Sequence, residues 1–599
     1  DPSGILQTTP ESLQSMLFNY RSEIPRMFSE LRFIIIDEIH AFMNSTRGLQ
    51  LMCELESISR IAGCSPRRIG LSATLSEEVA ADWLRGNDDR GISVVECDGS
   101  SEPDIVVTLD VFSKTGPSGD DDPVSKEMNE LRRANIKEYY GKLFDQTDGY
   151  NCLVFANSRL EAEKITHNLK IYSKGRYSNK NIEIHHGSIS KEIRKYSEEK
   201  IRSSQYGATV VTTSTLELGI DIGNIERVVQ RDPPYSCSSL IQRIGRSGRR
   251  TGIPVLRMFC TCDMDKDRDH PFDIPINLIR GIAMIELCTR DKWVEPIRHS
   301  SLPYGLLFQQ TMGYIGSNGG ATFGELCRNV LSCHPFRNIT ESDYAVMLKH
   351  MTEREYIGTF EGSLILTESG ERIVGSTDFL ATFSDDNRYE VISNGRLVGF
   401  IPKRPMANSH ILLAGRTWTV KSVSGNSVEV DNAVADAVTN WDGGEPFTHE
   451  RILQKMREVL DSDKGYPYLD DDSSRSLNAA RVASKMMYLT DPVPSFASEL
   501  IDIHPWMGSV QFNTLVRLLK NIDGITVVEC IPPYNIRIRT RYHPDGIRDI
   551  IESYRKKVDP YELINKNDYL EYEKFDRYVP KQLLKKKFIR DKIDLDFSI

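Results

Sequence analysis

The stretch Phe33-Ile34-Ile35-Ile36-Asp37-Glu38-Ile39-His40 decides the fold prediction for this chain. Four apolar residues, three of them β-branched, predict a buried parallel strand, and two acidic residues follow where that strand ends. Ligands of α/β folds bind at that edge of the sheet. An aspartate there suits a Mg²⁺ ion that bridges nucleotide phosphates, and the adjacent glutamate suits the orientation or deprotonation of a water. Taken alone, a strand followed by an acidic helix N-cap explains the stretch equally well.

Four further segments follow this stretch along the chain. They are Leu71–Leu75, Leu153–Arg159, Thr213–Asp221 and Gln242–Arg249. Together with the opening stretch they resemble motifs II, III, IV, V and VI of superfamily 2 DEAD/DEAH-type ATP-dependent helicases, in the family's order. The strong part of the resemblance covers roughly residues 1–260. Within the superfamily the chain resembles the large helicase-related (Lhr) group, chiefly because Ala414–Val420 is similar to a strand of that group.

Composition sets wide bounds on the protein. The chain has 599 residues, enough for about four domains, and 39% hydrophobic with 27% charged residues is ordinary for a globular protein. A net charge of −10 means that a nucleic acid would be bound by local basic patches. Eleven scattered cysteines without a pair of zinc motifs predict reduced thiols in a cytoplasmic protein. No apolar run approaches a membrane span, so no membrane partner is expected.

The pattern and the resemblance predict an α/β fold. We expect two RecA-like parallel-sheet lobes, the first partial, followed by a winged helix, a small β-barrel and a C-terminal α+β region. The predicted domains are 1–102 (C-terminal half of RecA-like domain 1), 103–125 (linker), 126–265 (RecA-like domain 2), 266–378 (winged-helix domain), 379–440 (small β-barrel) and 441–599 (C-terminal α+β domain). The linker is predicted from Asp, Gly, Pro and Ser after Pro103, and the winged helix from three helical segments and a hairpin at Gly358–Leu366.

One expected motif has no counterpart in these residues. The sequence contains no G-x-x-x-x-G-K-[S/T] loop, and its only Gly-Lys pair, Gly141-Lys142, lacks the glycine frame. Gly4–Leu13 resembles motif Ib, which follows that loop in the family. We therefore expect the loop in an upstream segment or a companion subunit, and this polypeptide alone to be inactive as an ATP hydrolase. A first sheet cut in this way would also expose an apolar face.

The resemblance implies ATP and Mg²⁺ as cofactors. Asp37 is expected to hold Mg²⁺ with Glu38 nearby, Glu38 to act on the attacking water, and Arg246 and Arg249, spaced i, i+3, to reach the γ-phosphate as arginine fingers. A solvated basic helix face is the alternative for the arginines, and strand-end capping is the alternative for the hydroxyls of motif III. The residues expected at the nucleotide are His40, Ser72, Thr74, Gly219, Asp221 and Gln242.

A second group is expected to contact nucleic acid, mostly by resemblance. It consists of Thr9, Pro10, Glu11, Asn157, Ser158, Arg159, His186, Gly187, Thr213, Ser214, Phe360 and Trp418. The hydroxyls after the strand Ala208–Thr213 suit phosphate oxygens. Three alternatives stay open. The two adjacent histidines suit a metal, Phe360 suits packing beneath its own hairpin, and Trp418 suits the core of its strand as well as a stacked base.

The resemblance implies an ATP-dependent translocase and helicase that moves 3′ to 5′ on single-stranded or tailed duplex DNA, with an RNA–DNA hybrid as a further substrate, in DNA repair or phage defence. The alternative is an accessory remodelling subunit that needs a partner or upstream segment for its phosphate loop. A third reading is a scaffold that only binds nucleic acid. Strand displacement separates the first two readings, and ATP turnover separates the third.

Overall fold

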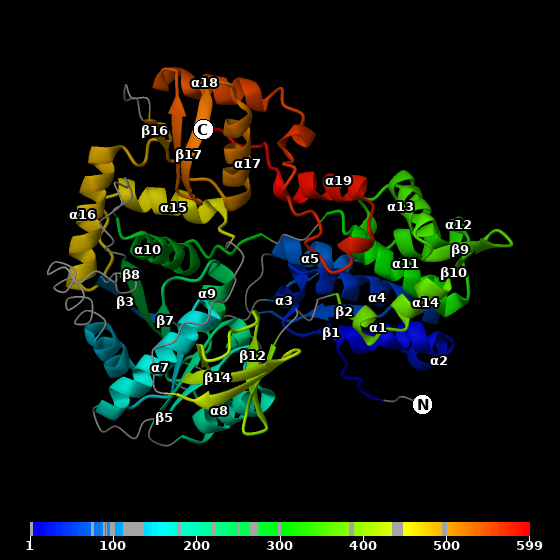
Figure 1. Ribbon diagram of the computed structural model, residues 1–599, viewed down its shortest axis with the longest axis horizontal. Coiled ribbons are helices and arrows are strands. Elements are labelled where there is room, and N and C mark those ends of the chain that lie inside the picture. Colours follow the sequence, from blue (N-terminus) through cyan, green and yellow to red (C-terminus); the bar gives the residue numbers. More distant parts are fainter. Residues whose placement is uncertain are drawn as a thin grey trace.

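A computed structural model describes residues 4–72, 77–87, 90–91, 93–95, 102–111, 137–175, 181–204, 207–217, 222–248, 252–262, 274–296, 301–382, 389–433, 447–493 and 500–599. It is a mixed α/β structure in which two parallel sheets form two lobes (Figure 1). The helices of the first lobe lie beside α11–α14, and the sheet of the second lobe lies below the C-terminal elements. Among the described residues, no helix is long and apolar enough to cross a membrane.

The first lobe is built around two parallel strands, β1 (Phe33–Ile36) and β2 (Arg67–Gly70). Its described helices are α1 (Pro10–Asn19), α2 (Ile24–Phe28), α3 (Ile39–Met43), α4 (Thr46–Ala62) and α5 (Glu77–Arg85). The predicted strand is present, but only part of it is buried: Phe33 is 56% exposed and Ile35 is 64% exposed. The apolar face expected from a cut sheet is therefore open in this chain.

The second lobe contains a six-stranded parallel sheet with the order β3-β8-β7-β4-β6-β5. Its strands are β3 (Asp104–Val111), β4 (Cys152–Phe155), β5 (Asn181–His185), β6 (Ala208–Thr212), β7 (Arg227–Arg231) and β8 (Val255–Cys262), and its helices include α7 (Arg159–Gly175), α8 (Lys191–Ser203) and α9 (Cys237–Ile244). The predicted linker boundary at residue 103 is wrong, because β3 is an edge strand of this sheet. Pro103, Asp104 and Asp110, which contributed to the linker prediction, lie immediately before or within β3, and most of the Asp, Gly and Pro residues follow it.

Three helices and a hairpin follow where they were predicted. They are α11 (Tyr304–Asn318), α12 (Phe323–Leu326) continued by a π-helical turn (Cys327–Leu331), α13 (Glu341–Glu353), and the antiparallel pair β9 (Ile357–Phe360) and β10 (Ser363–Leu366), with α14 (Glu368–Val374) after them. The start of this domain at residue 266 is wrong, because α10 (Ile276–Thr289) packs in the core of the second lobe.

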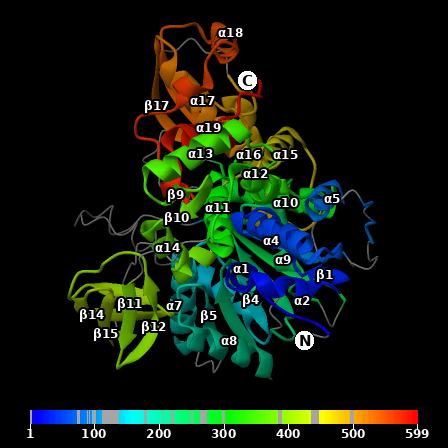
Figure 2. The same cartoon turned by 90° about the vertical axis from the view of Figure 1, so that its right-hand side faces the viewer.

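A five-stranded sheet occupies the place of the predicted barrel. Its order is β12-β11-β15-β14-β13, formed by β11 (Tyr389–Ser393), β12 (Arg396–Ile401), β13 (His410–Leu413), β14 (Arg416–Ser424) and β15 (Ser427–Asn432). No ladder joins β12 to β13 in the described part of the chain, so the sheet is open rather than a closed barrel. It docks on the second lobe beside α7 and α8, where Ser190 N donates to Val398 O (3.0 Å) and Phe400 N donates to Ser188 O (2.7 Å) (Figure 2).

The region predicted as one C-terminal domain is divided among three cores. Helices α15 (Glu450–Asp461) and α16 (Asp471–Met487) pack with α10 on the second lobe. A separate core contains the antiparallel sheet β16-β18-β17, formed by Leu500–Ile503, Asn535–Thr540 and Ile525–Ile531, with α17 (Ser509–Asn521) and α18 (Pro544–Arg555). The last helix, α19 (Lys581–Lys592), returns to α11. A single domain 441–599 is therefore incorrect.

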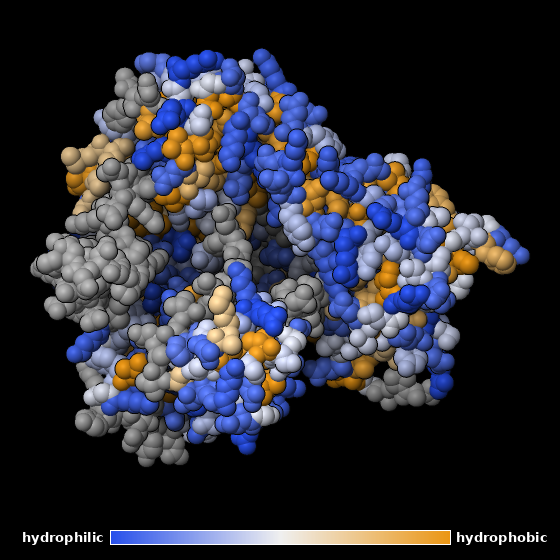
Figure 3. All heavy atoms as spheres, viewed as in Figure 1, coloured by the Kyte–Doolittle hydropathy of each residue, from blue (hydrophilic) through white to orange (hydrophobic). Residues whose placement is uncertain are grey.

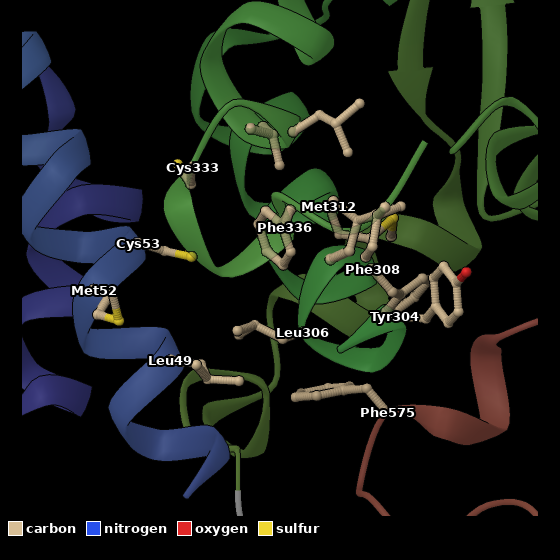
Figure 4. Packing of buried hydrophobic residues seen from close by; sticks show 14 of the residues in the cluster. Leu49, Met52, Cys53, Tyr304, Leu306, Phe308, Met312, Cys333, Phe336 and Phe575 are labelled. Carbon is tan, nitrogen blue, oxygen red and sulfur yellow. The ribbon is translucent and has the colours of Figure 1, made fainter. Parts of the chain in front are cut away.

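The first lobe and the winged-helix elements share one hydrophobic core. Figure 4 shows residues of α4 facing those of α11 and the C-terminal segment: Leu49, Met52, Cys53, Leu306, Phe308 and Phe575. Gly313 of α11 has no room for a side chain, since a Cβ there would lie 1.9 Å from the Phe18 ring of α1. Gln310 Nε2 donates to Gln14 Oε1 (2.7 Å) in the same buried interface. Because interiors are close-packed, these elements form one packed unit.

Candidate nucleotide and nucleic-acid site

The acidic pair of the opening stretch lies directly after β1. Glu38 has a φ of 49°, in the left-handed region that a residue with a Cβ rarely adopts. Its backbone N donates to Asp37 Oδ1 (3.0 Å), and Ile39 N donates to Leu71 O (3.0 Å), which ties the turn to the end of β2. Strained backbone of this kind persists where the surroundings hold it, often at functional sites.

His40 links the acidic pair to the end of β2. Its Nδ1 lies 2.8 Å from Ser72 Oγ and 3.5 Å from Glu38 Oε2. Burial lowers the pKa of His40, Arg246 lowers it further, and Glu38 opposes the shift. Ser72 was expected at the nucleotide, and its hydroxyl forms a hydrogen bond with this histidine. Thr74 lies outside the described residues.

A buried network holds motif VI against the neighbouring segments of the second lobe. Arg243 donates to Glu217 Oε1 from Nε (2.8 Å) and to Gln230 Oε1 from Nη1 (2.8 Å), and its Nη2 lies 2.6 Å from Glu217 Oε1. Arg243 Nη1 also donates to Asn157 Oδ1 (3.2 Å). The network thus joins the ends of three strands.

Asn157, which was expected to contact nucleic acid, is half-buried and uses its amide within this network. Its Nδ2 donates to Pro233 O (2.9 Å) while its oxygen accepts from Arg243. Glu217, Gln230 and Arg243 were missed by the sequence reasoning. The sequence did indicate them, because polar and charged residues next to apolar strands are buried only when they form hydrogen bonds or ion pairs with one another.

Arg246 lies in the turn after α9, because the helix ends at Ile244 and Gly245 is its C-cap. The prediction that Arg246 and Arg249 share a helical face is therefore wrong for Arg246, and Arg249 lies outside the described residues. Gly248 closes the turn with a φ of 76°, and a Cβ there would lie 2.5 Å from Pro254 N. Gln242 is on α9 and half-buried, and Gly219 and Asp221 are outside the described residues.

The arginine of this turn faces the acidic pair of the other lobe. Arg246 Nη2 lies 4.0 Å from Glu38 Oε1 and donates to the backbone oxygen of Glu217 (2.5 Å). Arg246 is 7% exposed. A guanidinium so placed is held by the second lobe and directed at a carboxylate of the first.

Several predicted nucleic-acid residues lie at exposed or half-buried positions. Thr9 is exposed and caps α1 by accepting from Ser12 N (3.3 Å), with Pro10 buried as the first helical residue. Glu11 forms an ion pair with Arg47, which donates to both carboxylate oxygens of Glu11 (2.6 and 2.9 Å). Its role in this structure is therefore to fix α1 on α4.

The second lobe contributes a comparable set. Ser214 is exposed and Thr213 half-buried, both after β6. Ser158 is exposed and caps α7 by accepting from Glu161 N (3.1 Å). Half-buried Arg159 and Gly187 are neighbours, since Arg159 Nη2 lies 4.0 Å from the Cβ position of the glycine.

Two aromatic predictions and one histidine have different outcomes. His186 is fully buried and contacts Glu163 Oε1 through Nε2 (2.8 Å), so it is structural and not a nucleic-acid contact. Trp418 is 7% exposed and donates from Nε1 to Leu413 O (2.8 Å), so its placement as a base-stacking residue is wrong and the core alternative holds. Phe360 is 61% exposed at the end of β9, so it does not pack beneath its hairpin. The described residues contain no group of three or more His, Cys, Asp or Glu side chains that could hold a metal ion.

Two helicase domain families match this chain. "DEAD/DEAH box helicase" matches residues 2–82, and "Helicase conserved C-terminal domain" matches residues 134–251. The ATP-dependent helicase Lhr-Core of Methanothermobacter thermautotrophicus is 27% identical over 550 residues, which is 85% of this chain and 60% of that protein. The chain is an Lhr-like protein of helicase superfamily 2.

A further Lhr relative supports this assignment, and a solved Lhr structure has a similar fold. The Lhr helicase/uracil glycosylase of Escherichia coli is 34% identical over 486 residues, 72% of this chain and 30% of that protein. The structure of Mycobacterium smegmatis helicase Lhr bound to ssDNA and AMP-PNP has a similar fold, with a TM-score of 0.60, 19% identity, and coverage of 99% of this chain and 79% of that one. This Lhr-like chain spans 60% of the length of the Methanothermobacter protein and 30% of the length of the Escherichia coli protein.

The donor set at the end of β1 fits Mg²⁺ in this Lhr-like protein. Mg²⁺ prefers oxygen ligands and is commonly held by one or two carboxylates together with substrate phosphates. Asp37 is exposed at the strand end, and Glu38 lies beside it. The Glu38 carboxylate lies on the side from which Arg246 approaches.

Proposed function

We propose that this chain carries the motor of an ATP-dependent nucleic-acid translocase and helicase. The observation that carries the proposal is the approach of Arg246 to Glu38 across the two lobes (4.0 Å). A nucleotide between the lobes would meet an acid that acts on water from one side and a cation that stabilises transferred charge from the other. Closure of the lobes on ATP is then converted to movement along a strand.

Each residue of the site has a proposed role. Asp37 would hold Mg²⁺, which supplies charge neutralisation on the phosphates, and Glu38 would orient the attacking water. Arg246, with Arg249, would reach the γ-phosphate. His40 would couple the position of the acidic pair to the end of β2, since its hydrogen bond with Ser72 links the two segments. Gln242, Thr74, Gly219 and Asp221 are proposed to lie at the nucleotide, as the family resemblance implies.

Hydrolysis would use a phosphate loop, and these 599 residues contain no G-x-x-x-x-G-K-[S/T] sequence. We propose that an upstream segment of the same polypeptide or a companion subunit supplies this loop. The exposed side chains of Phe33 and Ile35 support this, since a covering strand or helix would bury them. The same observation favours the second candidate function, an accessory remodelling subunit that acts only with its partner.

We propose single-stranded and tailed duplex DNA as the substrate, with 3′-to-5′ movement, and an RNA–DNA hybrid as a further substrate. Figure 3 shows that one face of the molecule is hollowed near its centre and that hydrophilic residues line much of the visible recess. The accessible predicted contacts on the two lobes include Thr9, Ser158, Arg159, Thr213 and Ser214. DNA repair or phage defence in the cytoplasm is the proposed setting.

The test compares this chain with the full-length protein. ATP turnover is measured with and without an oligothymidylate, and strand displacement with duplexes that carry a 3′ or a 5′ tail. The full-length protein should hydrolyse ATP faster with DNA and displace strands from the 3′-tailed duplex. The Glu38→Gln variant should bind ATP and lose turnover. ATP turnover without strand displacement on either duplex would favour the accessory function, and no DNA-stimulated turnover would contradict both.

A further inference from the structure

An open pocket of about 310 Å³ lies between the winged-helix elements and the C-terminal segment. Its walls come from α14, from the 3₁₀ turn η5 (Thr377–Leu380) and from the 3₁₀ turn η7 (Asp576–Tyr578). Residues that line it include Arg372, Ile373, Ser376, Phe379, Arg577 and Tyr578. A volume of this size is at the small end of ligand sites in proteins.

One arginine of the pocket is held in place by stacked rings. The Arg577 guanidinium lies over the Tyr578 ring, 4.9 Å from its centroid. Tyr578 in turn stacks on Phe308 of α11, with ring centroids 4.5 Å apart and an interplanar angle of 8°. A guanidinium that lies over a ring keeps its N–H donors at its edge, so it is oriented yet able to donate.

The second arginine is on the opposite wall. Arg372 pairs with Glu368 one helical turn away on α14 (2.5 Å), and both side chains are largely exposed. Exposed pairs of this kind contribute about 0–1 kcal/mol, so an anion with better geometry would displace the glutamate. Two arginines therefore line one pocket.

The acidic residue of the pocket does not cancel this charge. Asp378 accepts from Lys574 Nζ (2.8 Å), and the same ammonium group donates to Ala381 O (2.9 Å). Because Asp378 is paired with Lys574 and Arg372 with Glu368, the charge of Arg577 leaves the pocket with an excess of positive charge. Its floor is apolar, since Phe379 and Phe575 are buried beneath it.

We propose that this pocket binds one nucleotide unit of a single-stranded nucleic acid. The phosphodiester would be held by Arg372 and Arg577, with the hydroxyl of Ser376 beside them, and the sugar and base edge would lie on the apolar floor. Paired guanidinium groups suit phosphate geometry, and contacts to phosphate position a strand without reading its sequence. The pocket lies on the body formed by the first lobe and the winged helix, so it would hold the strand to that body.

This inference rests on the proposed nucleic-acid function, and the test separates the two. A fluorescent oligothymidylate is titrated with this chain, with Arg372→Gln, with Arg577→Gln and with the double variant, at several salt concentrations. Arg354→Gln is the control, because Arg354 is an exposed arginine at the end of α13 that does not line the pocket. Melting temperatures show whether Arg577→Gln disturbs the packing of Tyr578.

Each pocket variant should bind about tenfold more weakly, and the slope of log affinity against log salt should fall by about 0.7 for each phosphate that the variant no longer neutralises. Arg354→Gln should bind like the parent. If the pocket variants bind the oligonucleotide as tightly as Arg354→Gln does, the proposal that the pocket binds nucleic acid is overturned, and the proposed function is unaffected. A parent chain that does not bind the oligonucleotide at all would contradict the nucleic-acid function itself.

Arginine modification by phenylglyoxal gives a second readout that needs no substitution. Bound oligothymidylate should protect Arg372 and Arg577 and leave Arg354 reactive, as measured by mass spectrometry. Protection of the two arginines by a glutamate-rich peptide, but not by the oligonucleotide, would overturn the proposal in favour of an acidic protein partner.

Discussion

Arg246 of the second lobe lies 4.0 Å from Glu38 of the first, and it is the backbone oxygen of Glu217 that holds it there. The first lobe is packed to the winged helix through Gly313 and Phe18, whereas the small sheet β11–β15 is packed to the second lobe. The two lobes therefore belong to two composite bodies, which meet where Arg246 approaches Glu38. Four predictions test the elements of this arrangement, and a fifth tests its centre.

Glu217 is a positioning residue for Arg246. Its carboxylate holds the buried Arg243, and its backbone oxygen accepts from Arg246. Glu217→Gln should destabilise the chain by about 3–5 kcal/mol, because it leaves the Arg243 charge buried without its counter-charge. Chemical unfolding measures this, with the exposed Glu199→Gln as control. Equal stability of the two variants would show that the network is dispensable.

Glu163 joins the small sheet to the second lobe. Its carboxylate accepts from Ala414 N (2.7 Å), from Gly415 N and from His186. A glutamine in its place would turn an N–H donor toward one of these donors, at a cost of roughly 1–3 kcal/mol. Glu163→Gln should speed amide hydrogen exchange in β13 and β14 and leave β1 unchanged. Unaltered exchange in β13 would contradict the role of this link.

The C-terminal segment contributes a pH dependence through Asp576. Burial raises the pKa of Asp576 to about 6, and Lys587, its partner at 2.8 Å, only partly offsets this. Because the folded pKa lies above the usual 3.8, the stabilisation from protonated Asp576 is complete below pH 3.8 and is lost as the pH rises through 6.

The change corresponds to roughly 3 kcal/mol. The free energy of unfolding of the parent, relative to that of Asp576→Asn, should therefore fall between pH 4 and pH 6. Denaturant titrations at a series of pH values give this difference. A difference that rises over the same interval would mean that the ion pair with Lys587 outweighs the burial of the carboxylate.

The hairpin β9–β10 is the candidate for separating strands. Phe360 at its end is 61% exposed, and loss of a ring that stacks on a base costs about 1–3 kcal/mol. Phe360→Ala in the full-length protein should lower the rate of strand displacement about fivefold or more and leave DNA-stimulated ATP turnover largely intact. Tyr569→Ala, at a ring that is 73% exposed elsewhere, is the control. Equal displacement rates in the two variants would exclude the hairpin as the separating element.

Much of the fold was predictable because its signals are local. Apolar runs of four or five residues that end in polar groups identified β1, β4 and β6, and spacing identified α4, α11 and α13. The start of the second lobe was missed. The many Asp, Gly, Pro and Ser residues after residue 112 favoured a linker, and the short apolar run of β3 before them was included in it. Packing partners far along the chain, such as α10 with α15 and α11 with α19, leave no local signal.

The site was predictable in its residue types and less so in its contacts. Asp37, Glu38 and Arg246 were identified from their motifs, and the structure brings Glu38 and Arg246 together. Whether a polar or aromatic residue is buried depends on segments distant in sequence, so His186 and Trp418 were misplaced. Glu163 and the turn at Ala414 are 251 residues apart, and only the fold shows that His186 serves this link.

The central claim is that Glu38 and Arg246 act on one nucleotide from opposite lobes. Steady-state ATP hydrolysis by the full-length protein tests it most directly, with Arg246→Ala compared to Arg354→Ala at saturating DNA. A finger acts mainly on charge that develops in the transition state, so kcat should fall on the order of 10³-fold while KM for ATP stays within about threefold. If instead KM rises as much as kcat falls, Arg246 only binds ATP, and unchanged kinetics would show that it does not face the nucleotide at all.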